Sequence, residues 1–242
     1  MLTVVAADKA AADPELVDRA TNYFLLQELQ RQGNREAVAR ETANLLNEDA
    51  PKGSAEPDID WLNIFASFAE KASSERMRKH WASVLAAEIR TPGTFSLTTL
   101  QLLSVVDAVL AQIISEARGW IVNDFIPLVG KLTKGPEYTK LMKLDAVGFL
   151  KLGSAKYIGV TTAESPEAIG EIGPLEMGEK EVRIQSMPRQ CGVSSAILTP
   201  AGREVLELVA PAPADPEVLQ AFVEHLRSHG AVVEVVDVRK GG

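Results

Sequence analysis

Cysteine and histidine are scarce in this sequence of 242 residues, which has one cysteine, Cys191, and three histidines. A single cysteine excludes a disulfide within the chain and any zinc site built from several thiolates. We therefore expect a protein of the reducing cytoplasm without a metal or a cofactor. No uninterrupted apolar run reaches the roughly 18 residues that a membrane helix needs, so we expect no membrane association.

Positive charge is also in short supply, because the formal net charge is -8 and the pI is about 5.1. Proteins that coat nucleic acids or membrane surfaces need an excess of cations, so the overall balance argues against both classes. Aromatic residues make up only 5% of the chain, but 46% of it is hydrophobic. That content is ample for a folded core.

Residues 1–50 are predicted to form an N-terminal helical arm. Asp13 followed by Pro14 is a typical helix start, since an aspartate caps free amides and proline is tolerated in the first turn. Apolar residues recur at helical spacing on both sides of Gly33, where we expect a kink. Such a helix commonly lays one face on its own core, but it can also pack on a partner subunit. A linker is expected over residues 49–57.

The stretch from Asp58 to Leu103 is predicted to form three consecutive helices. Asp58 or Asp60 can cap the first, the second restarts after Ser73 and Ser74, and Ser96 can cap the third. Thr91-Pro92-Gly93 ends the second helix because proline disfavours helical geometry in the residue before it. Glu88 lies on the apolar face of that helix, so its carboxylate requires a basic or backbone donor.

The same stretch resembles a family of uncharacterised bacterial and prophage-borne proteins, the domain of unknown function number 2806. The resemblance rests on the patterns D-x-D-W-L-x-x-F, S-x-E-x-M-x-x-x-W-A-x-x-L-A-x-E and P-G-x-F-S-x-x-T-L. It implies a bacterial or phage cytoplasmic protein, and a looser likeness to abortive-infection proteins suggests a part in phage–host conflict. It implies no reaction. The signature residues with a structural or interaction role are Asp60, Trp61, Phe65, Trp81, Glu88, Pro92, Gly93 and Ser96.

The C-terminal half mixes helices and strands. Asp107 can cap a helix, and a further helix is expected over residues 137–150. Strands are expected over residues 156–161, 181–185, 193–198 and 231–238, with a loop over 163–180 and helices starting at Thr199 and at residue 216.

This order of helices and strands resembles a winged-helix module. We therefore predict an α+β, predominantly helical protein, with a helical scaffold followed by a C-terminal winged-helix-like α+β module. The expected parts are an arm over residues 1–50, a helical core domain over 58–130 and the module over 131–242.

Six lysines and two acids lie between residues 131 and 156, which is the most basic window of the chain. Lys140, Lys143 and Lys151 could contact phosphates from a recognition helix and its flank. The competing interpretation is an ordinary solvated face, because this window contains no arginine for base recognition.

Catalytic patterns are missing from the sequence. His80 precedes Glu88 by about two helical turns, which is too far for a direct pair. His225 and His229 share a helix face, but no third metal ligand is indicated, and a surface pair is the more common reason for such spacing. Cys191 is expected in a loop, and no histidine base is placed beside it.

The sequence therefore favours a non-catalytic protein-interaction or scaffold protein of a bacterium or prophage, with a role in anti-phage defence. We expect a protein partner and a homo-oligomer. The alternative is a winged-helix regulator that binds nucleic acid.

Overall fold

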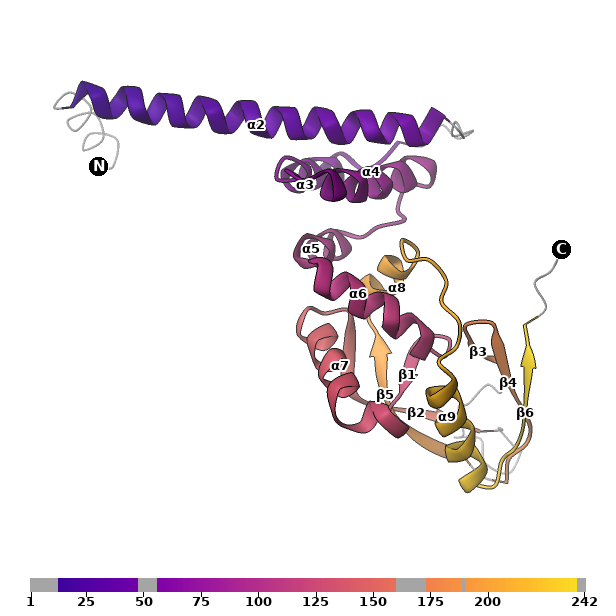
Figure 1. Cartoon of the computed structure of the whole chain (residues 1–242). Helices are drawn as coiled ribbons and strands as arrows, with labels where there is room; N and C mark the ends of the chain where they lie inside the picture. The colour runs from indigo at the N-terminus through magenta and orange to yellow at the C-terminus, as the bar shows by residue number, and fades with distance from the viewer. Residues whose placement is uncertain (1–12, 48–55, 160–172, 189, 239–242) are drawn as a thin grey trace. The chain divides into compact units, whose positions relative to one another are not determined.

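The computed structural model describes residues 13–47, 56–159, 173–188 and 190–238 (Figure 1). They fall into two compact units, Met1–Leu97 and Thr98–Gly242. The first is helical, and the second combines helices with two small antiparallel sheets. The predicted α+β, predominantly helical class is confirmed, while the domain boundaries predicted from the sequence stay predictions.

The first unit is built from three helices, α2 (Pro14–Asn47), α3 (Ile59–Ala69) and α4 (Glu75–Arg90). Helix α2 has 34 residues, runs through Gly33 without interruption and is straight in Figure 1, so the predicted kink is wrong. A single glycine inside a helix costs only about 1 kcal/mol relative to alanine, which the flanking turns absorb. Figure 1 shows α3 and α4 against the C-terminal half of α2, while its N-terminal half extends beyond them.

The core of this unit is aromatic. The Trp61 ring stacks on Phe65 with ring centroids 5.2 Å apart, and Phe65 meets the edge of Trp81 at 5.7 Å. The other side of Trp81 stacks on Phe68 at 5.5 Å. Such pairs add about 0.5–1.5 kcal/mol each to the area that they bury. The aromatic residues of the family signature therefore join α3 to α4.

Polar side chains fix α2 on this core. The side chain of Asn34, only 4% exposed, donates from Nδ2 to the Glu70 carbonyl at 2.8 Å and accepts at Oδ1 from the Arg78 guanidinium at 3.0 Å. Two turns further on, the buried Thr42 hydroxyl donates to the Val38 carbonyl at 2.9 Å. Buried polar groups need such partners, so they set the register of α2 against α3 and α4.

The second unit contains a sheet with the strand order β1-β5-β2, all antiparallel. The helices of this unit include α6, with Asp107 as its N-cap, and α8, with Thr199 as its N-cap, both as predicted. The helices and strands of this part follow one another in the chain, except that two strands of a second sheet lie between β2 and β5. The elements are α5 (Leu97–Val105), α6 (Ala108–Ala117), η1 (Arg118–Trp120), β1 (Phe125–Pro127), η2 (Gly130–Thr133), α7 (Pro136–Ala146), β2 (Leu150–Ile158), β5 (Cys191–Leu198) and α8 (Pro200–Leu206).

A second sheet has the order β3-β4-β6. Its strands are β3 (Leu175–Met177), β4 (Lys180–Ser186) and β6 (Val232–Asp237), and α9 (Pro216–Ser228) precedes β6. The loop predicted over 163–180 is wrong at its end, where β3 pairs with β4 across a turn at Gly178 (φ 58°). Its first part, up to residue 172, lies outside the described residues.

Strand β2 begins at Leu150, six residues before the predicted start at Lys156. Its pairing with β5 shifts register between Lys151 and Ser154, around Gly153 at φ 79°. Exposed and less exposed side chains alternate along β2, but Gly153, Ser154 and Ala155 have no large apolar side chain, so the sequence gives little sign of a strand there.

No single helix in the described part of the chain is long and apolar enough to cross a membrane. Only α5 and Ala108–Trp120, bent by 115° relative to each other, pass that test of length and composition as a pair.

Candidate functional site

The signature residues at the start of α3 have structural contacts. Asp58 is the N-cap and accepts from the Asp60 and Trp61 amides at 2.9 and 3.0 Å, whereas Asp60 lies exposed in the first turn. The Trp61 indole donates to the Phe95 carbonyl at 2.7 Å. Thus Trp61 ties α3 to the segment that follows α4.

Glu88 holds the turn after α4 and is only 2% exposed. Its Oε1 accepts from the Gly93 amide at 2.6 Å and its Oε2 from the Phe95 amide at 3.0 Å. The predicted need for a donor is confirmed, and the donors are backbone groups. Pro92 lies in this turn, Gly93 adopts φ 87°, and Ser96 directly precedes α5.

Glu88 and the aromatic residues of the signature therefore make contacts within the first unit. Phe65 and Trp81 are buried with Trp61 in the aromatic core. The arrangement stabilises the fold of the first unit.

Most lysines of the basic window are paired within the second unit. Lys140 contacts Glu116 at 2.7 Å and lies over the Trp120 ring at 6.0 Å. Hydrogen bonds from Lys140 and Gln112 hold the pKa of Glu116 below its usual value. Lys131 contacts Asp215 at 2.7 Å.

Lys151 and Lys156 also have carboxylates nearby, Asp145 at 3.9 Å and Asp124 at 3.2 Å. Lys143 is exposed on α7 and, like Lys134, makes no ion pair with the described residues. The three lysines predicted to contact nucleic acid are thus unequal. Lys140 contacts Glu116, and Lys151 lies 3.9 Å from Asp145. Lys143 makes no ion pair with any of the described residues.

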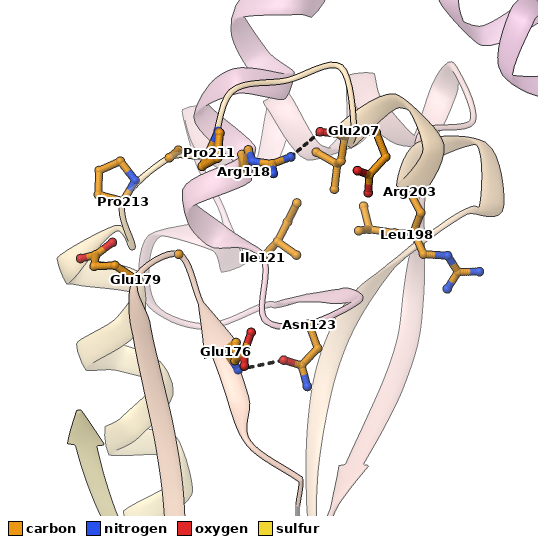
Figure 2. A pocket seen from close by; sticks show the side chains of 13 residues that line it. Arg118, Ile121, Asn123, Glu176, Glu179, Leu198, Arg203, Glu207, Pro211 and Pro213 are labelled. Atoms are coloured by element: carbon orange, nitrogen blue, oxygen red, sulfur yellow. Dashed lines mark hydrogen bonds between the residues drawn. The ribbon is translucent and has the colours of Figure 1, made fainter. Parts of the chain in front are cut away.

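A pocket of about 700 Å³ opens in the second unit (Figure 2). Arg118 donates to the Leu206 carbonyl at 2.6 Å, and Asn123 accepts from the Glu176 amide at 2.8 Å while adopting φ 51°. Glu179 accepts from the Ala214 amide at 2.9 Å, and this bond keeps its pKa below the usual value. The lining residues are Arg118, Ile121, Asn123, Glu176, Gly178, Glu179, Leu198, Arg203, Leu206, Glu207, Pro211, Ala212 and Pro213.

No cysteine, histidine, serine or lysine is among these described lining residues. Several of the polar groups are occupied by backbone partners, so the pocket presents no nucleophile with a neighbouring base. Sequence reasoning missed the pocket because its walls come from η1, the β3–β4 turn, α8 and the proline-rich segment after α8.

Cys191 opens β5 and is fully buried, so the predicted loop placement is wrong. Burial raises the pKa of its thiol. A neutral, buried thiol is a poor nucleophile, because the thiolate is the reactive form.

The largest group of exposed apolar side chains lies on the N-terminal half of α2. Tyr23 and Phe24 are each 65% exposed and Leu26 is 67% exposed. We call this surface the exposed apolar segment; its members are Leu16, Val17, Tyr23, Phe24, Leu25, Leu26 and Leu29.

Periodicity did single out Leu16, Phe24 and Leu25, but the expectation that they cover the chain's own core is wrong. The available signal was the run of four large apolar residues from Tyr23 to Leu26. Successive helical residues point about 100° apart, so this run surrounds the helix, and one underlying core cannot cover it.

The fold and these contacts define a predominantly helical α+β protein in which four signature residues, Trp61, Phe65, Trp81 and Glu88, are buried in the first unit. Residues 18–125 match the model of the family described as "Protein of unknown function (DUF2806)", so this part of the chain is similar to that family. The match confirms the resemblance and includes most of the exposed apolar segment. No curated protein and no solved structure matches the chain.

Proposed function

We propose that this is a non-catalytic protein-interaction protein that self-associates through the exposed apolar segment of α2. The observation that supports the proposal most is the exposure of Tyr23, Phe24, Leu25, Leu26 and Leu29 on consecutive turns. Monomeric soluble proteins rarely expose contiguous apolar patches of this kind, and those that exist commonly mark interaction sites.

A second copy of the chain is the occupant that the segment fits best. The face of α2 that carries Asn34 and Val38 packs on α3 and α4, and the same face continues toward the N-terminus as Phe24, Ala20 and Leu16. The apolar surface therefore continues the helix-packing surface of the first unit. Helix α2 of a second copy would pack on this face beside α3 and α4.

Charge favours an antiparallel arrangement of the two helices. Residues 13–18 carry three acids and no base, whereas residues 30–35 carry two bases, Arg31 and Arg35, and no acid. An antiparallel pair centred near Phe24 brings the acidic end of one copy to the basic end of the other, while a parallel pair would place like charges together. Flanking charges set helix orientation in this way in coiled coils.

The area is sufficient for a specific contact. Seven large side chains that are about half exposed offer roughly 100 Å² each, so two copies would bury on the order of 1,000 Å². Because Tyr23 to Leu26 surround the helix, assembly beyond a dimer would cover still more of this surface.

Light scattering after size exclusion tests the proposal. We expect a dimer or larger assembly at micromolar concentration, and a monomer throughout would overturn it. Single cysteines then test orientation: Phe24→Cys should cross-link between copies, whereas Leu16→Cys should cross-link only when Arg31→Cys, on the same helix face, is also present. Efficient cross-linking of Leu16→Cys alone would indicate parallel helices.

The biological setting that we propose is a bacterium or a prophage, with a role in anti-phage defence. It is supported by the family match together with the looser resemblance to abortive-infection proteins. A phage panel plated on cells with and without the gene tests this role. Protection that is lost with an assembly-deficient variant supports it, and equal plating efficiency on both strains contradicts it.

A second candidate function is nucleic-acid binding by the winged-helix-like module. The specific observation in its favour is the β1-β5-β2 sheet with α7 beside it and Lys143 exposed on that helix. A mobility-shift titration with duplex DNA and RNA tests it. Binding that weakens with added salt and with Lys134→Glu plus Lys143→Glu supports the function, and no shift with either nucleic acid contradicts it.

A further inference from the structure

The structure brings together three metal-ligand side chains that are up to 38 residues apart in the sequence. Cys191 comes from the first residue of β5, His225 from the last turns of α9, and His229 is the residue that caps α9. One ligand atom from each side chain lies within 4.8 Å of the others. The two imidazole rings have centroids 4.7 Å apart and a 43° angle between their planes.

Backbone carbonyls orient both imidazoles. His225 Nε2 lies 3.2 Å from the Gly192 carbonyl, and His229 Nδ1 lies 2.9 Å from the His225 carbonyl and 3.2 Å from the Ser228 hydroxyl. If each ring donates its N–H to the carbonyl, Nδ1 of His225 and Nε2 of His229 keep their lone pairs. Histidines that bind metals are held in this way, with the second nitrogen donating to a carbonyl or a carboxylate.

We propose that Cys191, His225 and His229 form a binding site for a divalent transition metal of the zinc class. A thiolate with two imidazoles is a ligand set that zinc prefers, and three protein ligands leave a fourth position for water or another ligand. Metal–ligand bonds of about 2.0–2.3 Å require the ligand atoms to come closer than 4.8 Å. The side chains therefore have to move closer together when the ion binds, and His229 is exposed, which leaves its ring room to move.

Binding replaces the proton of the Cys191 thiol by the metal ion, and that proton leaves to solvent. The two histidines bind as neutral imidazoles. Cys191 forms the buried side of the site and His229 the exposed side, so the ion has an approach from solvent. The bound ion would fasten the end of α9 to the start of β5 independently of any self-association through α2.

Cobalt(II) is the probe that tests the site, because its spectrum reports both thiolate ligation and geometry. The full chain is titrated at neutral pH with a thiol-free reductant. We expect one equivalent of Co²⁺ per chain, a thiolate-to-cobalt charge-transfer band and displacement of cobalt by Zn²⁺. Zinc should also raise the temperature of unfolding, since a ligand that binds only the folded state stabilises it.

Two variants and a matched control separate this site from adventitious binding. Cys191→Ser should abolish the charge-transfer band, and His229→Ala, at an exposed position, should weaken cobalt binding on the order of 100-fold without affecting folding. His80→Gln removes the one histidine outside the cluster and should leave binding unchanged. The proposal is overturned if no charge-transfer band forms, or if His229→Ala binds cobalt as the unaltered protein does.

Discussion

The two halves of helix α2 differ in what covers them. From Asn34 to Leu46 the helix buries Asn34, Val38 and Thr42 against α3 and α4. From Glu15 to Leu26 every side chain described is exposed, including the large apolar ones. One continuous helix thus passes from a packed half to an uncovered half.

The difference shows how polar and apolar side chains divide their roles along one helix. In the packed half a buried asparagine and a buried threonine specify the register, because each must find its partner. In the uncovered half the large side chains are mostly apolar, which supplies binding energy but little specificity. In the proposed assembly, the flanking charges at residues 13–18 and 30–35 therefore determine whether the two α2 helices run parallel or antiparallel.

The largest expected effect follows from placing charge on the uncovered half. Phe24→Glu with Leu26→Glu should weaken self-association by on the order of 100-fold or more, since each change removes about 2 kcal/mol of apolar burial and adds a charge to desolvate. Light scattering over a concentration series measures the shift.

A matched control is Ile59→Glu with Val109→Glu, which adds the same charge at two other exposed apolar positions. This control should assemble as the unaltered protein does. Equal loss of assembly in both double variants would show that added charge alone, and not the exposed apolar segment, is responsible.

Removing the polar anchor of the packed half should come next in size. Asn34→Ala should lower the free energy of unfolding of the first unit by about 2–3 kcal/mol, because the Glu70 carbonyl and the Arg78 guanidinium lose a buried partner. Denaturation followed by tryptophan fluorescence measures it. Asn22→Ala, on the exposed half of the same helix, should change stability by less than about 0.5 kcal/mol, and a similar cost at both positions would contradict the comparison.

A smaller loss is expected from Glu88→Gln. The amide can offer only one acceptor oxygen to the Gly93 and Phe95 amides, so unfolding should become easier by about 1–3 kcal/mol. Self-association should be unaffected. If Glu88→Gln leaves the denaturation midpoint unchanged, as we expect for the exposed Glu75→Gln, then Glu88 does not hold the turn.

The smallest effect concerns pH and His80 on α4. Burial and the neighbouring Arg76 lower the pKa of His80, and its Nε2 is buried without a partner among the described residues. The folded pKa is therefore below the unfolded value of about 6.5. Protonation favours the unfolded chain, so stability is complete above that value and declines as pH falls below it. In the His80→Leu variant the denaturation midpoint should change less between pH 7.5 and pH 5.5 than it does in the unaltered protein. An equal change in both proteins would contradict the role of His80.

Local signals in the sequence predicted much of the fold. Asp58, Asp107 and Thr199 cap helices as expected, and the Pro92-Gly93 turn ends α4, because these features depend on neighbours within four residues. Glu88 was recognised because a carboxylate on an apolar stripe must find a donor. The α+β, predominantly helical class followed from the same local signals.

Features that depend on distant pairing could not be predicted. Strands β1 and β3 have three residues each, too few for a periodic pattern, and exist through pairing with β5 and β4. The pocket and the Cys191–His225–His229 cluster are assembled from separate segments. Periodicity identified the apolar residues of α2, but it cannot say which stretch of a helix the rest of the chain will cover.

Hydrogen exchange of α2 at two protein concentrations tests the central claim most directly, because it compares both halves of the helix in one experiment. We predict that amides of residues 15–30 become more protected as concentration rises, while those of residues 34–46 stay protected at every concentration. Exchange of residues 15–30 that is fast and independent of concentration would contradict self-association through the exposed apolar segment.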